Sequence, residues 1–164
     1  MLDILSRVEV TKWLGDGPPK IMKDLTEAHA KIDTYAERSA SPPLGQWAVE
    51  RVADGVVLGT VLLLTLPNDE HGEVEIGWHL HPDSWGHGYA TEAAAAVLRF
   101  GFEGGLPEII AVSHTYNEAS KAVMRKLGMT DLGVVEKWYD DPSACFVMTA
   151  EQWSARAKAQ PKSD

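Results

Sequence analysis

Two glycines separated by one residue stand directly before a helix-forming stretch. Gly86 and Gly88 flank His87 within Trp85–Thr91, and the unbroken helical pattern Glu92–Phe102 follows. Glycines here allow the backbone to turn tightly and to approach a ligand closely. The first N–H groups of the following helix lack intrahelical partners, and its dipole points its positive end at the loop. This arrangement suits a phosphate or pyrophosphate, although an ordinary helix start that contains glycine gives the same pattern.

The elements around this loop alternate between strand and helix patterns. Residue spacing and turn residues predict helices at 2–14, 22–39, 92–102 and 117–126 and strands at 47–52, 56–66, 73–81, 109–114, 132–139 and 144–149. Asn117 is the expected N-cap of its helix, and Gly128 its expected end. The tail 155–164 is polar and is expected to be frayed. No repeat or linker interrupts this order, so one domain over 1–164 is expected.

Composition excludes several functional classes. The chain has 164 residues, 45% of them apolar, and a formal net charge of −9 without a basic block, which argues against nucleic acid as a partner. Cys145 is the only cysteine, which excludes an intrachain disulfide and a cysteine-rich metal site. His79 and His81 lack a third ligand, so no metal is expected. No leader and no membrane-length apolar run is visible, so a cytoplasmic protein with no membrane partner is expected.

Three motifs then occur in a fixed order. A strand with Glu75-Ile76-Gly77-Trp78 leads to Pro82 and the glycine loop, Asn117-Glu118-Ala119-Ser120 follows a later strand, and Lys126-Leu127-Gly128-Met129 closes the next helix. This order resembles the GNAT N-acetyltransferases, and within them the ribosomal-protein (RimJ/RimL-like) branch, over residues 46–149. The resemblance implies a mixed α/β (α+β) fold. Its centre is a twisted, mostly antiparallel sheet with one splayed strand pair and flanking helices.

The same resemblance implies acetyl-CoA as co-substrate and an amine as acceptor. Backbone N–H groups of the glycine loop would hold the CoA pyrophosphate, and the splayed strand would bond the pantetheine arm, with the N–H near Leu80 as the oxyanion donor. The expected cofactor-binding residues are Trp78, His79, Leu80, Trp85, Gly86, His87, Gly88, Tyr89, Ala90, Thr91, Asn117, Ser120 and Lys121.

Acetyl transfer requires a neutral amine, so a base must accept a proton. Glu75 is the first candidate because it lies on the strand that leads into the loop, and Glu73 on the same face is the second. Many family members protonate the leaving thiolate with a tyrosine, but Met124 occupies that position here. The ribosomal branch carries a serine like Ser120 close to the expected sulfur, so the resemblance implies Ser120 as the candidate acid or sulfur-stabilising donor, and Tyr116 is a second candidate. A helix-start serine that only bonds backbone remains an alternative for Ser120.

Other interpretations remain open at this point. A CoA-binding module without catalysis would also fit, and a dinucleotide-binding oxidoreductase fits less well because Thr91 replaces the third glycine of that fingerprint. Protein N-termini and small-molecule amines are both possible acceptors. Family members begin with a strand for which this chain has no room before its first helix. We therefore expect an exposed sheet edge and self-association, such as a homodimer.

Overall fold

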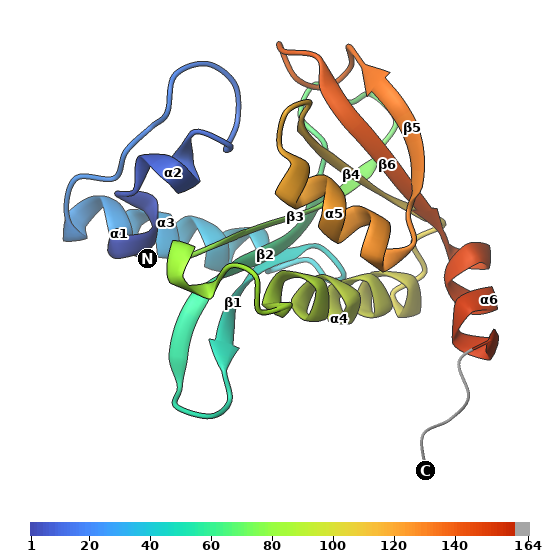
Figure 1. Cartoon of the computed structure of the whole chain (residues 1–164), viewed down its shortest axis with the longest axis horizontal. Coiled ribbons are helices and arrows are strands. Elements are labelled where there is room, and N and C mark those ends of the chain that lie inside the picture. The colour runs from blue at the N-terminus through green and yellow to red at the C-terminus, as the bar shows by residue number, and fades with distance from the viewer. Residues whose placement is uncertain (160–164) are drawn as a thin grey trace.

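The computed structural model describes residues 1–159 and consists of a six-stranded sheet with helices on both faces (Figure 1). The strands lie in the order β1-β2-β3-β4-β6-β5, and every neighbouring pair is antiparallel except β3–β4. The elements are α1 (Leu2–Leu5), α2 (Val8–Thr11), α3 (Leu25–Arg38), β1 (Gly45–Arg51), β2 (Val56–Thr65), β3 (Val74–Leu80), η1 (Pro82–Ser84), α4 (Tyr89–Glu103), β4 (Glu108–His114), α5 (Glu118–Leu127), β5 (Thr130–Val135), β6 (Ser143–Thr149) and α6 (Ala150–Ala159). The predicted fold class is confirmed.

The main core lies between α4, α5 and one face of the sheet. Leu63 of β2, Ile76 of β3 and Phe146 of β6 are fully buried there beside Leu98 of α4 and Met124 of α5. Because strand side chains alternate between faces, the residues between these core positions point to the opposite face. That second face of β1–β3 is covered by the N-terminal helices, which form a separate layer (Figure 1).

The parallel pair β3–β4 is held together at one point. Glu75 and Ile110 are the only registered partners between the two strands, while β2–β3 pairs along its whole length from Thr65 and Val74 to Gly59 and Leu80. Beyond Glu75 the strands therefore separate toward the η1 end of β3. This is the expected splayed pair, and it opens the middle of the sheet.

The N-terminal part differs from the prediction. The expected helix over 2–14 is two short helices, α1 and α2, separated at Ser6–Arg7. The expected helix over 22–39 begins only at Leu25, because the Asp24 carboxylate accepts a hydrogen bond from the Glu27 N–H and caps the first turn. Lys12 to Asp24 is thus a loop of turns and bends between α2 and α3, and much of it lines the cavity described below.

The C-terminal part also differs. Strand β5 ends at Val135, not at Tyr139, because Trp138 adopts a positive φ of 68° that a strand cannot continue through. The part of the expected frayed tail up to Ala159 belongs to α6, where Trp153 packs against Phe102 of α4. Residues 160–164 of that prediction lie outside the described part. None of the described helices is both long enough and apolar enough to cross a membrane.

Candidate active site

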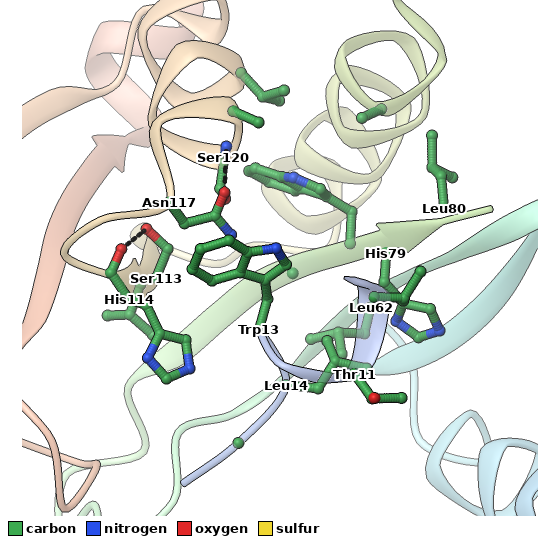
Figure 2. A pocket seen from close by; sticks show the side chains of 18 of the residues that line it. Thr11, Trp13, Leu14, Leu62, His79, Leu80, Ser113, His114, Asn117 and Ser120 are labelled. Atoms are coloured by element: carbon green, nitrogen blue, oxygen red, sulfur yellow. Dashed lines mark hydrogen bonds between the residues drawn. The ribbon is translucent and has the colours of Figure 1, made fainter. Parts of the chain in front are cut away.

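A cavity of about 1170 Å³ passes through the gap between β3 and β4. On one side it is lined by the glycine loop and the first turn of α5, and on the other by the segment between α2 and α3. Figure 2 shows Trp13 of that segment between Asn117 of α5 and His79 of β3. The cavity therefore connects the two faces of the sheet through the place where its hydrogen bonds are missing.

The glycine loop has the geometry that a phosphate site requires. Gly86 and Gly88 have φ values of 79° and 88°, which L residues with a side chain rarely adopt. Gly88 is the N-cap of α4 and offers no side-chain cap, so the first N–H groups, beginning with Tyr89, are free for a ligand. A Cβ atom at either glycine would meet nothing within 4 Å, so the backbone conformation, not crowding, requires glycine.

The predicted cofactor-binding residues around the glycine loop differ in how they contribute to it. The indole N–H of Trp85 donates to the Leu80 carbonyl at 3.0 Å and fixes the loop to the end of β3. Ala90 and Thr91, predicted as loop residues, form the first turn of α4. The His87 side chain is exposed, lies beside the Tyr89 ring and does not line the cavity. His87 would therefore contribute to a phosphate site through its main chain and not through its imidazole.

The backbone of β3 presents unpaired groups to the gap. The His81 N–H donates to the Leu58 carbonyl and the Leu66 N–H to the Glu73 carbonyl, so odd-numbered residues of β3 bond to β2. The N–H groups of Trp78 and Leu80 consequently point toward β4, where the ladder has ended. Trp78 and Leu80 are two of the three residues of β3, with His79, that the resemblance predicts for cofactor binding.

The first turn of α5 forms the far wall of the gap. The Asn117 carboxamide oxygen accepts a hydrogen bond from the Ser120 N–H at 3.1 Å, which confirms the predicted N-cap (Figure 2). Ser120 lines the cavity, and Met124 one turn later is buried. The other two predicted residues of this region lie elsewhere. Tyr116 is 88% exposed and outside the cavity lining, and the Lys121 ammonium is held by the Thr115 carbonyl and the Glu118 carboxylate.

A partly buried carboxylate lies where β3 and β4 part. The Tyr139 hydroxyl donates to the carboxylate of Glu75, with oxygen distances of 2.9 and 2.8 Å. Burial raises the pKa of Glu75 to about 7, and the hydrogen bond from Tyr139 acts in the opposite direction. Glu75 is thus divided between its acid and base forms at neutral pH, which suits a group that must accept a proton there.

The segment that carries Tyr139 is held against the β2–β3 loop. The Glu73 carboxylate accepts hydrogen bonds from the Lys137 ammonium and the Trp138 indole N–H, and the Asn68 amide donates to the Trp138 carbonyl. These contacts maintain the positive φ of Trp138 and bring the next residue over Glu75. Glu73 therefore serves as an anchor here, and it does not line the cavity.

His79 differs from its expected role in cofactor binding. As an odd-numbered residue of β3 it bonds through its main chain to Thr60 of β2, and its imidazole lies within 2.9 Å of the Thr60 hydroxyl on the second face. Burial, with the Lys31 ammonium and the N-terminal amine, lowers the pKa of His79 to about 4. No group of three or more potential metal ligands from His, Cys, Asp and Glu occurs among residues 1–159.

Comparison with known proteins identifies the family. Residues 1–130 match the Acetyltransferase (GNAT) domain family. The chain belongs to the GNAT acetyltransferases. These enzymes use acetyl-CoA, so this GNAT chain is an acetyltransferase with a donor site and an acceptor site.

Three proteins illustrate what this GNAT chain is similar to. It is 30% identical over 159 residues to FsC-acetyl coenzyme A-N(2)-transacetylase of Aspergillus fumigatus, covering 88% of this chain and 66%, just under two thirds, of that relative. It is 31% identical over 134 residues to the N-acetyltransferase YoaA of Bacillus subtilis, covering 81% of this chain and 73% of the relative. The fold matches Mycobacterium smegmatis RimJ in complex with CoA-disulfide, with a TM-score of 0.73, 17% identity and coverage of 95% and 84%.

Sequence reasoning missed two cavity residues of this acetyltransferase. Tyr139 was predicted as part of a strand, and its contact with Glu75 depends on a backbone turn that no local pattern announces. Trp13 falls within the predicted helix 2–14, whereas its ring centre lies 6.0 Å from that of His114, and both residues line the cavity. An aromatic residue just before a glycine- and proline-rich segment was the available signal.

Proposed function

We propose that this GNAT enzyme transfers the acetyl group of acetyl-CoA to a primary amine by direct attack in a ternary complex. The observation that carries the proposal is the partly buried Glu75 carboxylate at the point where the two faces of the sheet meet through the cavity. A donor bound from one face and an acceptor bound from the other would meet beside this group. No intermediate on the enzyme is required by such an arrangement.

The donor side would be held mainly by main-chain groups. The N–H groups at the start of α4, with Gly86 and Gly88 in their positive-φ conformation, suit the pyrophosphate of CoA. The outward N–H groups of Trp78 and Leu80 suit the pantetheine amides and the thioester oxygen. Asn117 is committed to its helix cap, so its contribution is to fix the first turn of α5.

On the acceptor side, Glu75 would act as the general base. The amine nitrogen forms a bond to the thioester carbon, the carbon–sulfur bond breaks, and the proton released from nitrogen passes to the Glu75 carboxylate. Ser120, which lines the gap opposite, would supply a proton or a hydrogen bond to the departing thiolate. Tyr116 has no part in this scheme because its side chain faces solvent.

The replacement Glu75→Gln tests the proposal. It keeps the size and a hydrogen-bond acceptor for Tyr139 but removes the base, so we expect kcat/KM to fall about 100-fold or more on a panel of primary amines. Binding of acetyl-CoA, followed by calorimetry, should remain. A wild-type protein that binds acetyl-CoA but acetylates no amine would instead support a CoA-binding module without catalysis.

Protein N-termini and small-molecule amines are both candidate acceptors. The relatives named above include a transacetylase whose name specifies an N(2) position and a RimJ protein, so the family names do not favour one class. The donor, acetyl-CoA, is common to the family, so the residues that select between protein N-termini and small-molecule amines must lie on the acceptor side of the cavity.

We also propose self-association through the edge of β1. The Ser39 hydroxyl bonds both the N–H and the carbonyl of Gln46, which shows that these groups point away from β2. Ala48 lies two residues further, so its main-chain groups face the same open edge. We expect a dimer by light scattering and a monomer after Ala48→Pro, which removes the outward N–H. A monodisperse wild-type monomer would contradict this.

A further inference from the structure

The acceptor half of the cavity extends well beyond the base. Glu75, Gly77 and His79 share the second face of β3, since strand residues alternate. Gly77 has no side chain, and a Cβ atom there would approach Leu62 of β2 at 3.3 Å. Gly77 and Leu62 therefore form the low floor of a groove that runs along β3 from Glu75 to His79 (Figure 2 shows Leu62 beside His79).

Buried polar side chains stand at the far end of this groove. Tyr35 of α3, Gln46 of β1 and Thr60 of β2 are 7%, 7% and 3% exposed, and all but Thr60 line the cavity. The imidazole of His79 completes the group through its contact with Thr60. The Thr60 hydroxyl bonds the His79 imidazole, and the Gln46 side-chain oxygen accepts from Arg38, so these groups form a polar end wall that suits a polar part of the acceptor.

Positively charged side chains gather at the same end of the groove. Lys31 and Arg38 extend from α3 one turn before and one turn after Tyr35, and both line the cavity with Lys20. The Arg38 guanidinium donates to the Gln46 side-chain oxygen at 3.3 Å, and the Lys31 ammonium lies 5.6 Å from the Tyr35 ring centre.

Among residues 1–159 these cations form no ion pair within 4.0 Å. Two carboxylates also line the cavity, Glu9 and Glu27, and Glu27 lies one turn before Lys31 on α3. The pKa of Lys31 is lowered by burial and by the neighbouring charges of Arg38 and Lys20. A cluster of cations in a chain of net charge −9 is a place where an anion would be stabilised.

We propose that the acceptor of this enzyme carries, besides its amine, a carboxylate that Lys31 and Arg38 bind at the His79 end of the groove. This inference rests on the proposed function and names its substrate class. His79 is four residue steps along β3 from Glu75, so the amine and the carboxylate lie roughly 13 Å apart at about 3.3 Å per step. The acceptor is thus an extended amino acid or short peptide of about four residues.

The test compares tetraglycine with tetraglycine amide, two acceptors of equal length that differ in the terminal charge. We expect wild-type kcat/KM to be about tenfold higher for the acid, because a hydrogen bond to a charged group is stronger than one to a neutral group. Diglycine and its amide are too short to reach and should show no such ratio.

The double variant Lys31→Gln/Arg38→Gln should bring the ratio for the tetrapeptides close to one. Lys23→Gln, which removes an exposed charge of the same region outside the cavity, should keep the wild-type ratio. Retained binding of acetyl-CoA shows that each variant is folded. A wild-type ratio near one, or a double variant that keeps the preference, overturns the inference.

Failure of the proposed function gives a different result. If propylamine is acetylated but tetraglycine is not, the enzyme activity stands and the inference falls. If no amine is acetylated, the activity falls, and calorimetry of tetraglycine and its amide with the CoA-bound protein decides the inference alone. Tighter binding of the acid supports it, and equal binding or none overturns it.

Discussion

Replacement of Tyr139 by phenylalanine should move the pH profile of the enzyme. The Tyr139 hydroxyl donates to the Glu75 carboxylate and opposes the effect of burial, which raises the pKa of Glu75 to about 7. A hydrogen bond to a charged group contributes about 1.5–3 kcal/mol, and 1.36 kcal/mol corresponds to one pKa unit. Without it the pKa of Glu75 should rise further, by about one to two units.

The sign of the effect follows from the role of the base. Only the carboxylate accepts a proton, so activity rises as the pH passes upward through the pKa of Glu75. At pH 7 about half of the wild-type enzyme carries the carboxylate, and in Tyr139→Phe this falls to roughly one tenth to one hundredth. We expect kcat/KM at pH 7 to drop about 5- to 50-fold and to recover at higher pH.

The assay is kcat/KM from pH 5.5 to 9.5, followed by release of free thiol. Tyr116→Phe is the matched control, because it removes an exposed hydroxyl outside the cavity and should leave the profile unchanged. An acid limb that stays in place in Tyr139→Phe would refute the reasoning. A decrease that is equal at every pH would assign Tyr139 a purely structural role.

Three further predictions test other parts of the site. Burial raises the pKa of Glu75 from 4.5 to about 7, so the folded state is favoured below pH 4.5 and loses up to about 3 kcal/mol as the pH rises past 7. Glu75→Gln should therefore be more stable than wild type to urea at pH 8 but not at pH 4, and an equal difference at both pH values would argue against the shift. Ser120→Ala should lower kcat about 100-fold if its hydroxyl protonates the thiolate, and an unchanged kcat would leave Ser120 as a helix-start residue. Gly88→Ala places a side chain at φ 88°, which costs about 1–2 kcal/mol, and should weaken acetyl-CoA binding by calorimetry. Gly55→Ala, at φ 71° in the β1–β2 turn, is the control that should lose similar stability and bind normally.

The sequence predicted best those features that depend on neighbours along the chain. The turn at Gly86 and Gly88, the cap at Asn117 and the helix end at Gly128 each follow from one residue type at one position. The family order of these motifs then predicted the sheet and its splayed pair, because the loop and the two helices occupy fixed places in that fold.

Features that depend on distant contacts were missed or misplaced. Tyr139 reaches Glu75 across 64 positions of sequence and through the positive φ of Trp138, which nothing local predicts. His79 was expected at the cofactor because it lies beside Leu80, but alternation along β3 turns it to the other face. Helix α6 was missed because its exposed positions are polar and the packing of Trp153 on α4 stabilises it.

The single registered contact between β3 and β4 has a consequence for the order of binding. Within the sheet, β1–β3 and β4–β6 form two halves, and Glu75 and Ile110 are the one registered pair between β3 and β4. A pantetheine arm that forms hydrogen bonds with the open backbone of β3 would link the two halves. It should slow hydrogen exchange of backbone amides in both β3 and β4. The cavity, whose lining includes Trp78 of β3 and Val112 of β4, would then reach its final width only after the donor has entered. We therefore expect compulsory-order kinetics, in which acetyl-CoA binds before the acceptor.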